Sequence, residues 1–164
     1  MKRTVLVLLI AGLLTTQGIA GEQKSPSLQG VWQAVEVTMP GPVKRTITVP
    51  EPRPNLMTIT ARHYSRVQVD AEGSRPAVAD VTKASADDLR AAWGPFYAEA
   101  GTYEVTGNVI TLRPVAAKNP AAMTPGAFTT WSFTLESNTL RVTSQRNQDG
   151  PIVNPPTITL VRVE

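Results

Sequence analysis

From residue 28 onward, apolar and polar residues alternate with a period of two along most of the chain. This is the pattern of strands that bury one face. Thr and Val are frequent in these segments, whereas Pro, Gly and Asn separate them. Eight strands are predicted, over residues 30–38, 56–61, 64–69, 101–106, 109–115, 128–136, 139–145 and 157–163.

Short links between several of these strands predict antiparallel neighbours. Gly107 and Asn108 interrupt EVTGNVITL, and Ser137 and Asn138 interrupt FTLESNTLRV; these residue types tolerate the positive φ of tight hairpins. The predicted fold is therefore all-β, an eight-stranded antiparallel up-and-down barrel, which leaves no exposed edge. A two-sheet sandwich gives a similar pattern and remains an alternative. The interior of such a barrel is either filled by side chains or holds one small ligand.

One short helix is predicted within KASADDLRAAWGP, between the third and fourth strands. Ser85 can cap its first turn, where Asp87 and Asp88 suit the positive end of the helix dipole. Leu89 and Trp93 lie four residues apart on one face, and a Gly-Pro pair ends the helix. Two turns are not stable alone in water, so this helix is expected to pack on the body of the protein.

The first twenty residues have the layout of a secretory signal peptide. Lys2 and Arg3 precede an apolar run over residues 5–14, and Gly18 and Ala20 supply small side chains before the expected cleavage after Ala20. The run is too short to span a bilayer comfortably, and no later stretch is apolar enough to do so. Residues 21–164 then form a single periplasmic or secreted domain, long enough to bury a substantial core.

Composition narrows the classes of partner. Removing Lys2 and Arg3 leaves 14 of the 16 basic residues against 13 acidic ones, and the basic residues are dispersed. This balance argues against nucleic acid and against a polybasic membrane surface. The chain has no cysteine, which excludes disulfides, thiolate sites and a lipid-modified cysteine. With one histidine and no ligand spacing among the carboxylates, neither a metal nor another cofactor is expected.

Two features resemble the lipocalins. Gly30-Val31-Trp32 opens the first strand and Arg162 lies in the last. In that family the tryptophan packs over the closed end of the barrel under the arginine, a contact that adds roughly 0.5–2 kcal/mol. These barrel-closing roles are what the resemblance implies for Gly30, Trp32 and Arg162.

Longer segments resemble the small secreted bacterial lipocalin-like domain proteins, whose members are mostly uncharacterised. The resemblance covers nearly all of residues 28–163 and lies in TARHYSRVQVD, AAWGPFYAEAGTYEVTGNVITLRPVAAKNP and FTTWSFTLESNTLRVT. The chain departs from typical lipocalins in lacking their disulfide and in having a helix between the third and fourth strands. The resemblance implies a barrel and a small apolar ligand, without saying which.

Strict alternation assigns the faces of the strands. Within residues 56–69 it places His63 and Ser65 inside and Arg62 and Arg66 on a solvated outer face, although a turn at His63 would invert half of this assignment. In the first strand a bulge after Trp32 is favoured, because Glu36 would otherwise lie inside. The other residues expected inside are Tyr103, Val105, Ile110, Leu112, Trp131, Phe133, Leu135, Leu140, Val142, Ile158, Leu160 and Arg162.

The predicted function is the binding of a small apolar or amphipathic molecule in the barrel. Trp131 and Phe133 would supply apolar walls, and His63, Ser65 and Tyr103 the polar contacts. His63 as an ordinary hydrogen-bonded residue at the barrel rim, and Trp131 as core, are the structural alternatives. Two other functions stay open: an isomerase or hydrolase with His63 as a weak candidate general base, and a filled barrel that interacts through its proline-rich loops.

Two further groups have alternative roles. Trp93, Phe96 and Tyr97 either cover the barrel mouth as a lid or pack the helix against the outside. Lys118 and Asn119 either contact an anionic group of a ligand or belong to a solvated loop.

Overall fold

The computed structural model describes residues 27–41, 45–48, 55–71 and 73–164, so the predicted signal peptide lies outside the described residues. The described part contains ten strands, one α-helix and one short 3-10 helix. Their bounds are β1 (Gly30–Met39), β2 (Arg45–Thr48), β3 (Asn55–Ile59), β4 (His63–Val69), α1 (Ala86–Trp93), β5 (Phe96–Thr106), β6 (Val109–Ala117), η1 (Pro120–Met123), β7 (Thr129–Glu136), β8 (Thr139–Asn147), β9 (Gly150–Pro151) and β10 (Thr157–Arg162).

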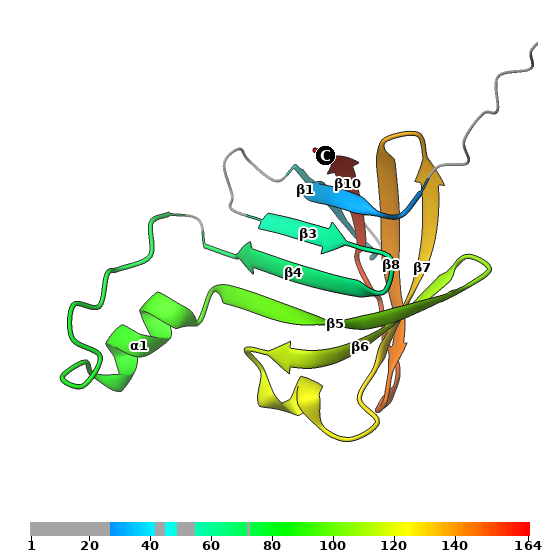
Figure 1. Ribbon diagram of the computed structural model, residues 1–164. Coiled ribbons are helices and arrows are strands. Elements are labelled where there is room, and N and C mark those ends of the chain that lie inside the picture. The colour runs from blue at the N-terminus through cyan, green and yellow to red at the C-terminus, as the bar shows by residue number, and fades with distance from the viewer. Residues whose placement is uncertain (1–26, 42–44, 49–54, 72) are drawn as a thin grey trace, which may run out of the picture.

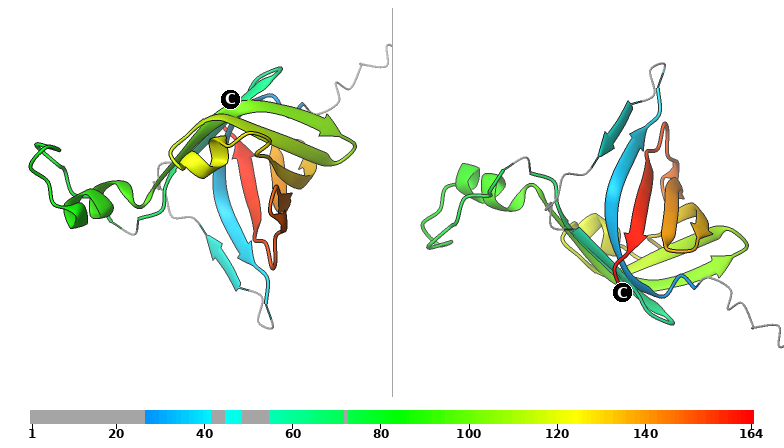
Figure 2. Two further views of the ribbon diagram at one scale, coloured as in Figure 1. Left: turned by 90° about the horizontal axis from the view of Figure 1, so that it is seen from below. Right: turned by 90° about the horizontal axis from the view of Figure 1, so that it is seen from above.

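Eight of the strands close into a barrel (Figures 1 and 2). Each pairs antiparallel with the next in the order β10, β1, β3, β4, β5, β6, β7, β8, and β8 pairs with β10 to complete the ring. The predicted eight-stranded antiparallel barrel is therefore confirmed, and the sandwich alternative is excluded. Helix α1 lies between the third and fourth barrel strands, as predicted. No helix in the described ranges is both long and apolar enough to cross a membrane.

The core fills the inside of the barrel with side chains from all eight of its strands. Among the residues predicted to lie inside, Tyr103, Phe133, Leu135 and Ile158 are partly buried against this core. Val105 differs from its prediction: it lies two residues before the Gly107 turn, and 44% of it is exposed. The buried cluster consists of Trp32, Met57, Ile59, Tyr64, Ile110, Leu112, Trp131, Leu140, Val142 and Leu160.

The hairpin between β3 and β4 corrects the predicted faces of β4. Residues 60–62 form a turn, in which the Thr60 amide donates to the His63 carbonyl at 2.9 Å. Ile59 consequently pairs with Tyr64, and Met57 pairs with Arg66. Because Met57 and Ile59 are buried, Tyr64 and Arg66 also point inward, whereas His63 and Ser65 point outward. The turn accounts for the difference, since a continuous strand would have kept His63 inside.

Strand β1 contains the expected bulge, between Ala34 and Glu36. Glu36 pairs with Thr159, whose hydroxyl lies 3.4 Å from the Glu36 carboxylate on the outer face. At this point β1 also changes its neighbour from β3 to β2. The Asn55 side chain bridges the change, since its Oδ1 accepts from the Ala34 amide at 2.6 Å and its Nδ2 donates to the Ala34 carbonyl at 3.2 Å.

At one end of the barrel, Arg162 lies over Trp32. The Arg162 Cζ is 4.2 Å from the centre of the indole ring, and Trp32 is fully buried. The guanidinium also donates to the carbonyls of Ser27 and Gln29. Gly30 has φ +144°, and a Cβ there would lie 2.6 Å from the Glu164 carbonyl oxygen. Glycine is therefore required where the chain passes under Arg162. We call this the closed end.

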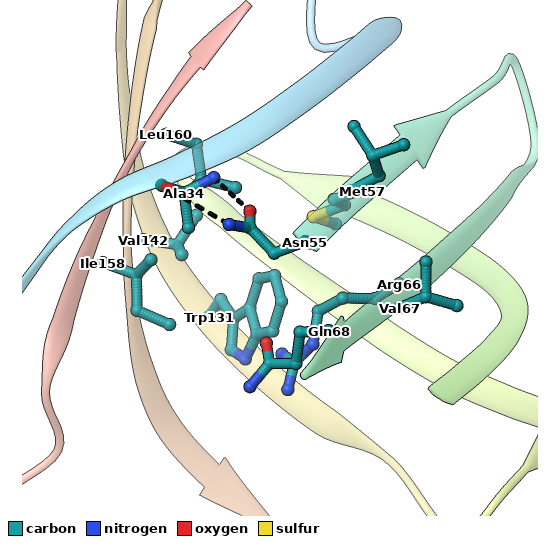
Figure 3. Close-up of a pocket in the computed structure, with 11 residues that line it drawn as sticks. Ala34, Asn55, Met57, Arg66, Val67, Gln68, Trp131, Val142, Ile158 and Leu160 are labelled. Atoms are coloured by element: carbon teal, nitrogen blue, oxygen red, sulfur yellow. Dashed lines mark hydrogen bonds between the residues drawn. The ribbon is translucent and has the colours of Figure 1, made fainter. Parts of the chain in front are cut away.

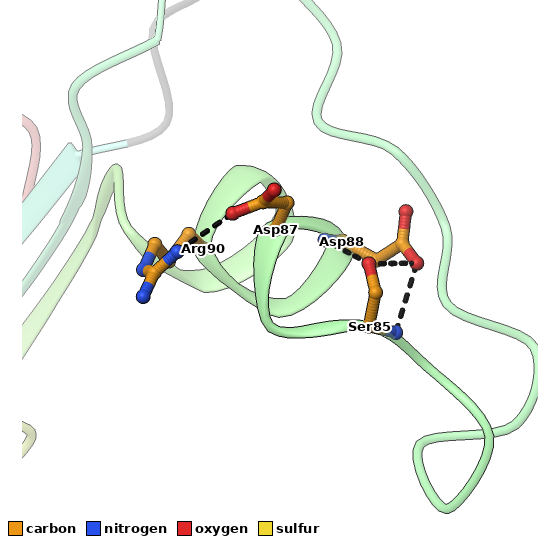
Figure 4. A network of polar contacts seen from close by, with 4 residues as sticks. All are labelled: Ser85, Asp87, Asp88 and Arg90. Carbon is orange, nitrogen blue, oxygen red and sulfur yellow. Dashed lines mark hydrogen bonds and ion pairs between the residues drawn. The ribbon is translucent and has the colours of Figure 1, made fainter.

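The segment over residues 70–71 and 73–95, which includes α1, leaves the barrel at the opposite end and is here called the arm (Figures 1 and 2). A capping box begins α1: the Ser85 hydroxyl accepts from the Asp88 amide at 3.1 Å, and the Ser85 amide donates to the Asp88 carboxylate at 3.0 Å (Figure 4). Hydrogen bonds from Ser85 lower the pKa of Asp88. Asp87 and Arg90 form an exposed ion pair on the next turn.

Lys118, at the end of β6, fixes the other end of α1. Its ammonium donates to the carbonyls of Trp93, Gly94 and Phe96, at 3.0 Å for Gly94 and 2.7 Å for Phe96. The carbonyls of Trp93 and Gly94 stand at the negative end of the helix dipole, which favours a cation, whereas Phe96 is the first residue of β5. Lys118 therefore joins the arm to the barrel.

Candidate functional site

A pocket opens beside the point where β1 changes neighbours (Figure 3). Its enclosed volume is about 20 Å³, which is room for roughly one water molecule. Together with its mouth, which is open to solvent, it takes in about 320 Å³. Its lining includes the apolar side chains of Ala34, Met57, Trp131, Val142, Ile158 and Leu160 and the polar side chains of Asn55, Arg66 and Gln68.

Arg66 is the charged residue among the described residues that line this pocket. It projects from β4 toward Trp131, as Gln68 does, because both side chains are on the inner face of that strand (Figure 3). Its Cζ lies 4.2 Å from the centre of the Tyr97 ring and 5.4 Å from that of Trp131. The guanidinium is thus held by aromatic rings, an arrangement worth about 0.5–2 kcal/mol per favourable contact.

The Arg66 Nε is buried and has no hydrogen-bond partner among the described residues. No ion pair within that part of the chain includes Arg66 either. An arginine carries five N–H donors, and a buried donor without a partner costs free energy. Arg66 is therefore held in place by ring contacts, with hydrogen-bonding capacity unused.

Two tyrosines and Glu99 lie on the inner face beside Arg66. The β4–β5 register pairs Arg66 with Glu99 and Gln68 with Tyr97. Burial raises the pKa of Tyr97, and burial followed by the negative charge of Glu99 raises that of Tyr64. The negative charge of Glu99 contributes to both shifts, whereas the Tyr64 hydroxyl is buried without a hydrogen-bond partner in the described part of the chain. These three groups form a polar cluster next to the guanidinium.

The structure brings one of the five predicted ligand contacts to the pocket. Trp131 lines it and is 3% exposed, so it belongs both to the pocket wall and to the core. Phe133 packs against the core without being among the residues that line the pocket. The Tyr103 hydroxyl donates to the Thr60 carbonyl at 2.8 Å, in the β3–β4 turn near the closed end.

His63 and Ser65, the other two, lie on the outer face of β4. His63 is exposed, and its amide donates to the Thr60 hydroxyl at 3.1 Å. Neither residue is among those that line the pocket. The expectation that they face a ligand inside the barrel is therefore corrected by the turn at residues 60–62.

Sequence reasoning missed Arg66 and Asn55 as pocket residues. Arg66 was assigned to the outside with Arg62 because the strand was assumed to run through His63. A signal was present, since a turn at His63 inverts that assignment. Asn55 gave no signal of its own, because its role depends on the change of strand partners at Ala34.

Lys118 and the Trp93–Phe96 pair take part in holding the arm, whereas Tyr97 contacts Arg66 inside the barrel. Lys118 is occupied by the carbonyls of Trp93, Gly94 and Phe96. The Asn119 side chain accepts from the Ala121 amide at 3.1 Å at the start of η1. Trp93 is 52% exposed and meets the edge of Phe96 at 6.2 Å between ring centres. The arm projects away from the barrel (Figures 1 and 2), and none of its described residues lines the pocket, so it does not act as a lid in this structure.

Acidic and histidine side chains of the described residues do not gather into a metal site. Within the described ranges, no group of three or more His, Asp or Glu residues is arranged to hold a metal ion.

Comparisons with known proteins find two solved structures of low similarity. No family model matches the chain, and no curated protein sequence matches it. A lipocalin-like protein from Bacteroides uniformis is similar with a TM-score of 0.45 and 13% identity, over 82% of this chain and 97% of that one. An uncharacterized protein from Bacteroides eggerthii is similar with a TM-score of 0.44 and 11% identity, over 83% and 99%.

Proposed function

We propose that this barrel binds a small apolar or amphipathic molecule in the pocket beside Trp131. The observation that supports the proposal is the make-up of the pocket, in which apolar walls surround a few convergent polar groups, as in most small-molecule sites. A ligand's apolar part would be stabilised by about 25 cal/mol for each Å² that it buries. Arg66 and Gln68 take the polar role that the sequence assigned to His63 and Ser65.

The small enclosed volume means that a ligand has to displace side chains as it enters. Arg66 and Gln68 are long side chains at the mouth, and Gln68 is tied to Asp70 by hydrogen bonds of 2.9 and 3.1 Å. Trp131, Val142 and Leu160 form the other side and are buried in the core. We therefore expect binding to move the β4 side chains and to leave the core wall in place.

Native mass spectrometry of the protein, purified gently from its own host, tests this function. An extra mass that disappears after solvent extraction would support a binding barrel and identify the ligand. Replacing Ala34 with Leu should fill the enclosed space and abolish the extra mass, whereas Ala116→Leu, on an exposed position of β6, should retain it. Retention of the extra mass in Ala34→Leu would contradict binding in this pocket.

A filled barrel without a ligand is the second candidate, and the enclosed volume of about 20 Å³ favours it. Such a protein would act through its surface, where the arm exposes Trp93 and Val81. A bare protein mass, together with no binding of fatty acids or isoprenoids, would support this candidate. The enzyme alternative has no observation in its favour, since His63 is exposed at the start of β4 and does not line the pocket.

We also propose that the protein is exported and cleaved after Ala20, on the strength of the residue pattern described above. The same mass spectrum tests this proposal. A measured mass equal to that of residues 21–164 would support it, and a mass that includes the residues before Gly21, Lys2 and Arg3 among them, would contradict it.

A further inference from the structure

The guanidinium of Arg66 is the strongest unexplained feature of the barrel interior. Its Nε is buried without a partner in the described part of the chain, and the residue lines the pocket. We infer that the ligand carries a carboxylate, which binds the guanidinium of Arg66 between Tyr97 and Trp131. This inference rests on the proposed function and specifies the chemical class of the ligand.

Ring contacts alone do not satisfy Arg66. The faces of Tyr97 and Trp131 interact with its positive charge but accept none of its N–H groups in a conventional hydrogen bond. A cation taken partly out of water is costly unless an anion and hydrogen-bond acceptors replace the lost water. A carboxylate supplies both, because its two oxygens match the fork of the guanidinium.

Glu99 does not already fill this role. It lies opposite Arg66 in the β4–β5 pairing, yet no ion pair joins the two residues. Besides burial, its negative charge raises the pKa of Tyr64 and Tyr97, and the Tyr64 hydroxyl is buried without a hydrogen-bond partner among the described residues. Tyr97 and Glu99 are not among the pocket residues, whereas Trp131 is. The Trp131 side of Arg66 is therefore the side from which a ligand can approach.

The other polar side chains of the pocket are engaged in hydrogen bonds within the protein, so Arg66 is the group that would favour a charged ligand over a neutral one. The Asn55 amide bonds the backbone of Ala34, and the Gln68 Nε2 donates to Asp70. Glu99 still acts at a distance, because its negative charge opposes a second carboxylate near Arg66. A neutral side chain at position 99 should therefore strengthen the binding of an anionic ligand and leave a neutral one unaffected.

A matched pair of probes separates charge recognition from apolar burial. We would titrate decanoate and decanol into the wild-type protein at neutral pH by isothermal titration calorimetry. Decanoate should bind at least about tenfold more tightly than decanol. Arg66→Met should reduce the affinity for decanoate to that for decanol, and Arg66→Lys should retain part of the preference for decanoate. Arg62→Met, which removes an exposed arginine four residues away, should change neither affinity.

The outcomes distinguish this inference from the proposed function. Equal affinities for the two probes in the wild type, or a preference for decanoate that survives Arg66→Met, would overturn the carboxylate assignment while leaving a binding barrel. Binding of neither probe would overturn both. Near-UV circular dichroism checks that Arg66→Met is folded; if it is not, Glu99→Gln decides, since it should raise the affinity for decanoate severalfold without changing that for decanol.

Discussion

Arg162 shows how a single side chain can close one end of the barrel. It covers the buried Trp32 ring at 4.2 Å and donates to two carbonyls of the segment that precedes β1. The substitution Arg162→Ala removes a cation–π contact and charged hydrogen bonds. It should therefore lower the free energy of unfolding by about 2 kcal/mol relative to the wild-type protein. Urea unfolding followed by tryptophan fluorescence measures this change.

Arg141→Ala is the matched control for that variant. Arg141 forms an exposed ion pair with Glu136 at 3.8 Å, a kind of contact worth roughly 0–1 kcal/mol. Equal destabilisation by the two substitutions would show that Arg162 acts as an ordinary surface charge.

The raised pKa values of the three tyrosines predict how the stability of the protein depends on pH. Burial raises the pKa of Tyr64, Tyr97 and Tyr103 above the ordinary value of about 10. The folded protein then keeps protons that the unfolded chain releases, so their stabilisation is complete below about pH 10 and is lost as the pH rises through the higher folded values. We expect a lower urea midpoint at about pH 11 than at about pH 9.

The ultraviolet absorbance of tyrosinate provides an independent check on these groups. In the folded protein it should appear at higher pH than in the same protein in denaturant. Coincident titration curves in the two states would contradict burial of the hydroxyls.

At the scale of elements, the arm depends on one lysine of the barrel. The ammonium of Lys118 binds the carbonyls of Trp93 and Gly94 at the end of α1 and the Phe96 carbonyl at the start of β5. Helix α1 has few other contacts with the barrel core, since Ala92 is its buried residue. Lys118→Met should therefore speed amide hydrogen exchange in α1 by tenfold or more, while exchange in β5 to β8 stays slow.

Lys83→Met is the control for this element. Lys83 is an exposed residue of the arm that pairs with Asp80 at 3.4 Å. Its substitution should leave exchange in α1 nearly unchanged. Unaltered exchange in Lys118→Met would mean that the capping box at Ser85 is sufficient to hold the helix.

At the scale of the whole molecule, the barrel should fold without the arm. Val69 pairs with Phe96, and the Asp70 amide donates to the Pro95 carbonyl at 2.8 Å, so β4 and β5 already meet where the arm leaves. Replacing residues 71–94 with Asn-Gly should yield a cooperative barrel whose near-UV circular dichroism retains the signal of Trp32 and Trp131. Loss of cooperative unfolding would show that the arm contributes to the core.

Features of the fold that depend on residues close together along the chain could be predicted from the sequence, whereas features that depend on distant residues could not. Alternation along a strand and turn residues such as Gly107 act over a few neighbours, and they sufficed to predict the eight barrel strands, the helix and the antiparallel barrel, but not β9. The face of each strand was predicted correctly where no irregularity intervened, as in β6 and β8. The bulge in β1 was also predictable, because Glu36 had to leave the interior.

The pocket was decided by the tertiary structure. A three-residue turn before His63 reverses every side chain of β4, and a period of two gives no warning of a shift by one residue. The contacts of Arg66 with Tyr97 and Trp131, and of Lys118 with α1, join residues that are distant along the chain. By itself the sequence determined a closed barrel with an apolar interior; only the packing of its strands decided that an arginine, and not the histidine, lies inside it.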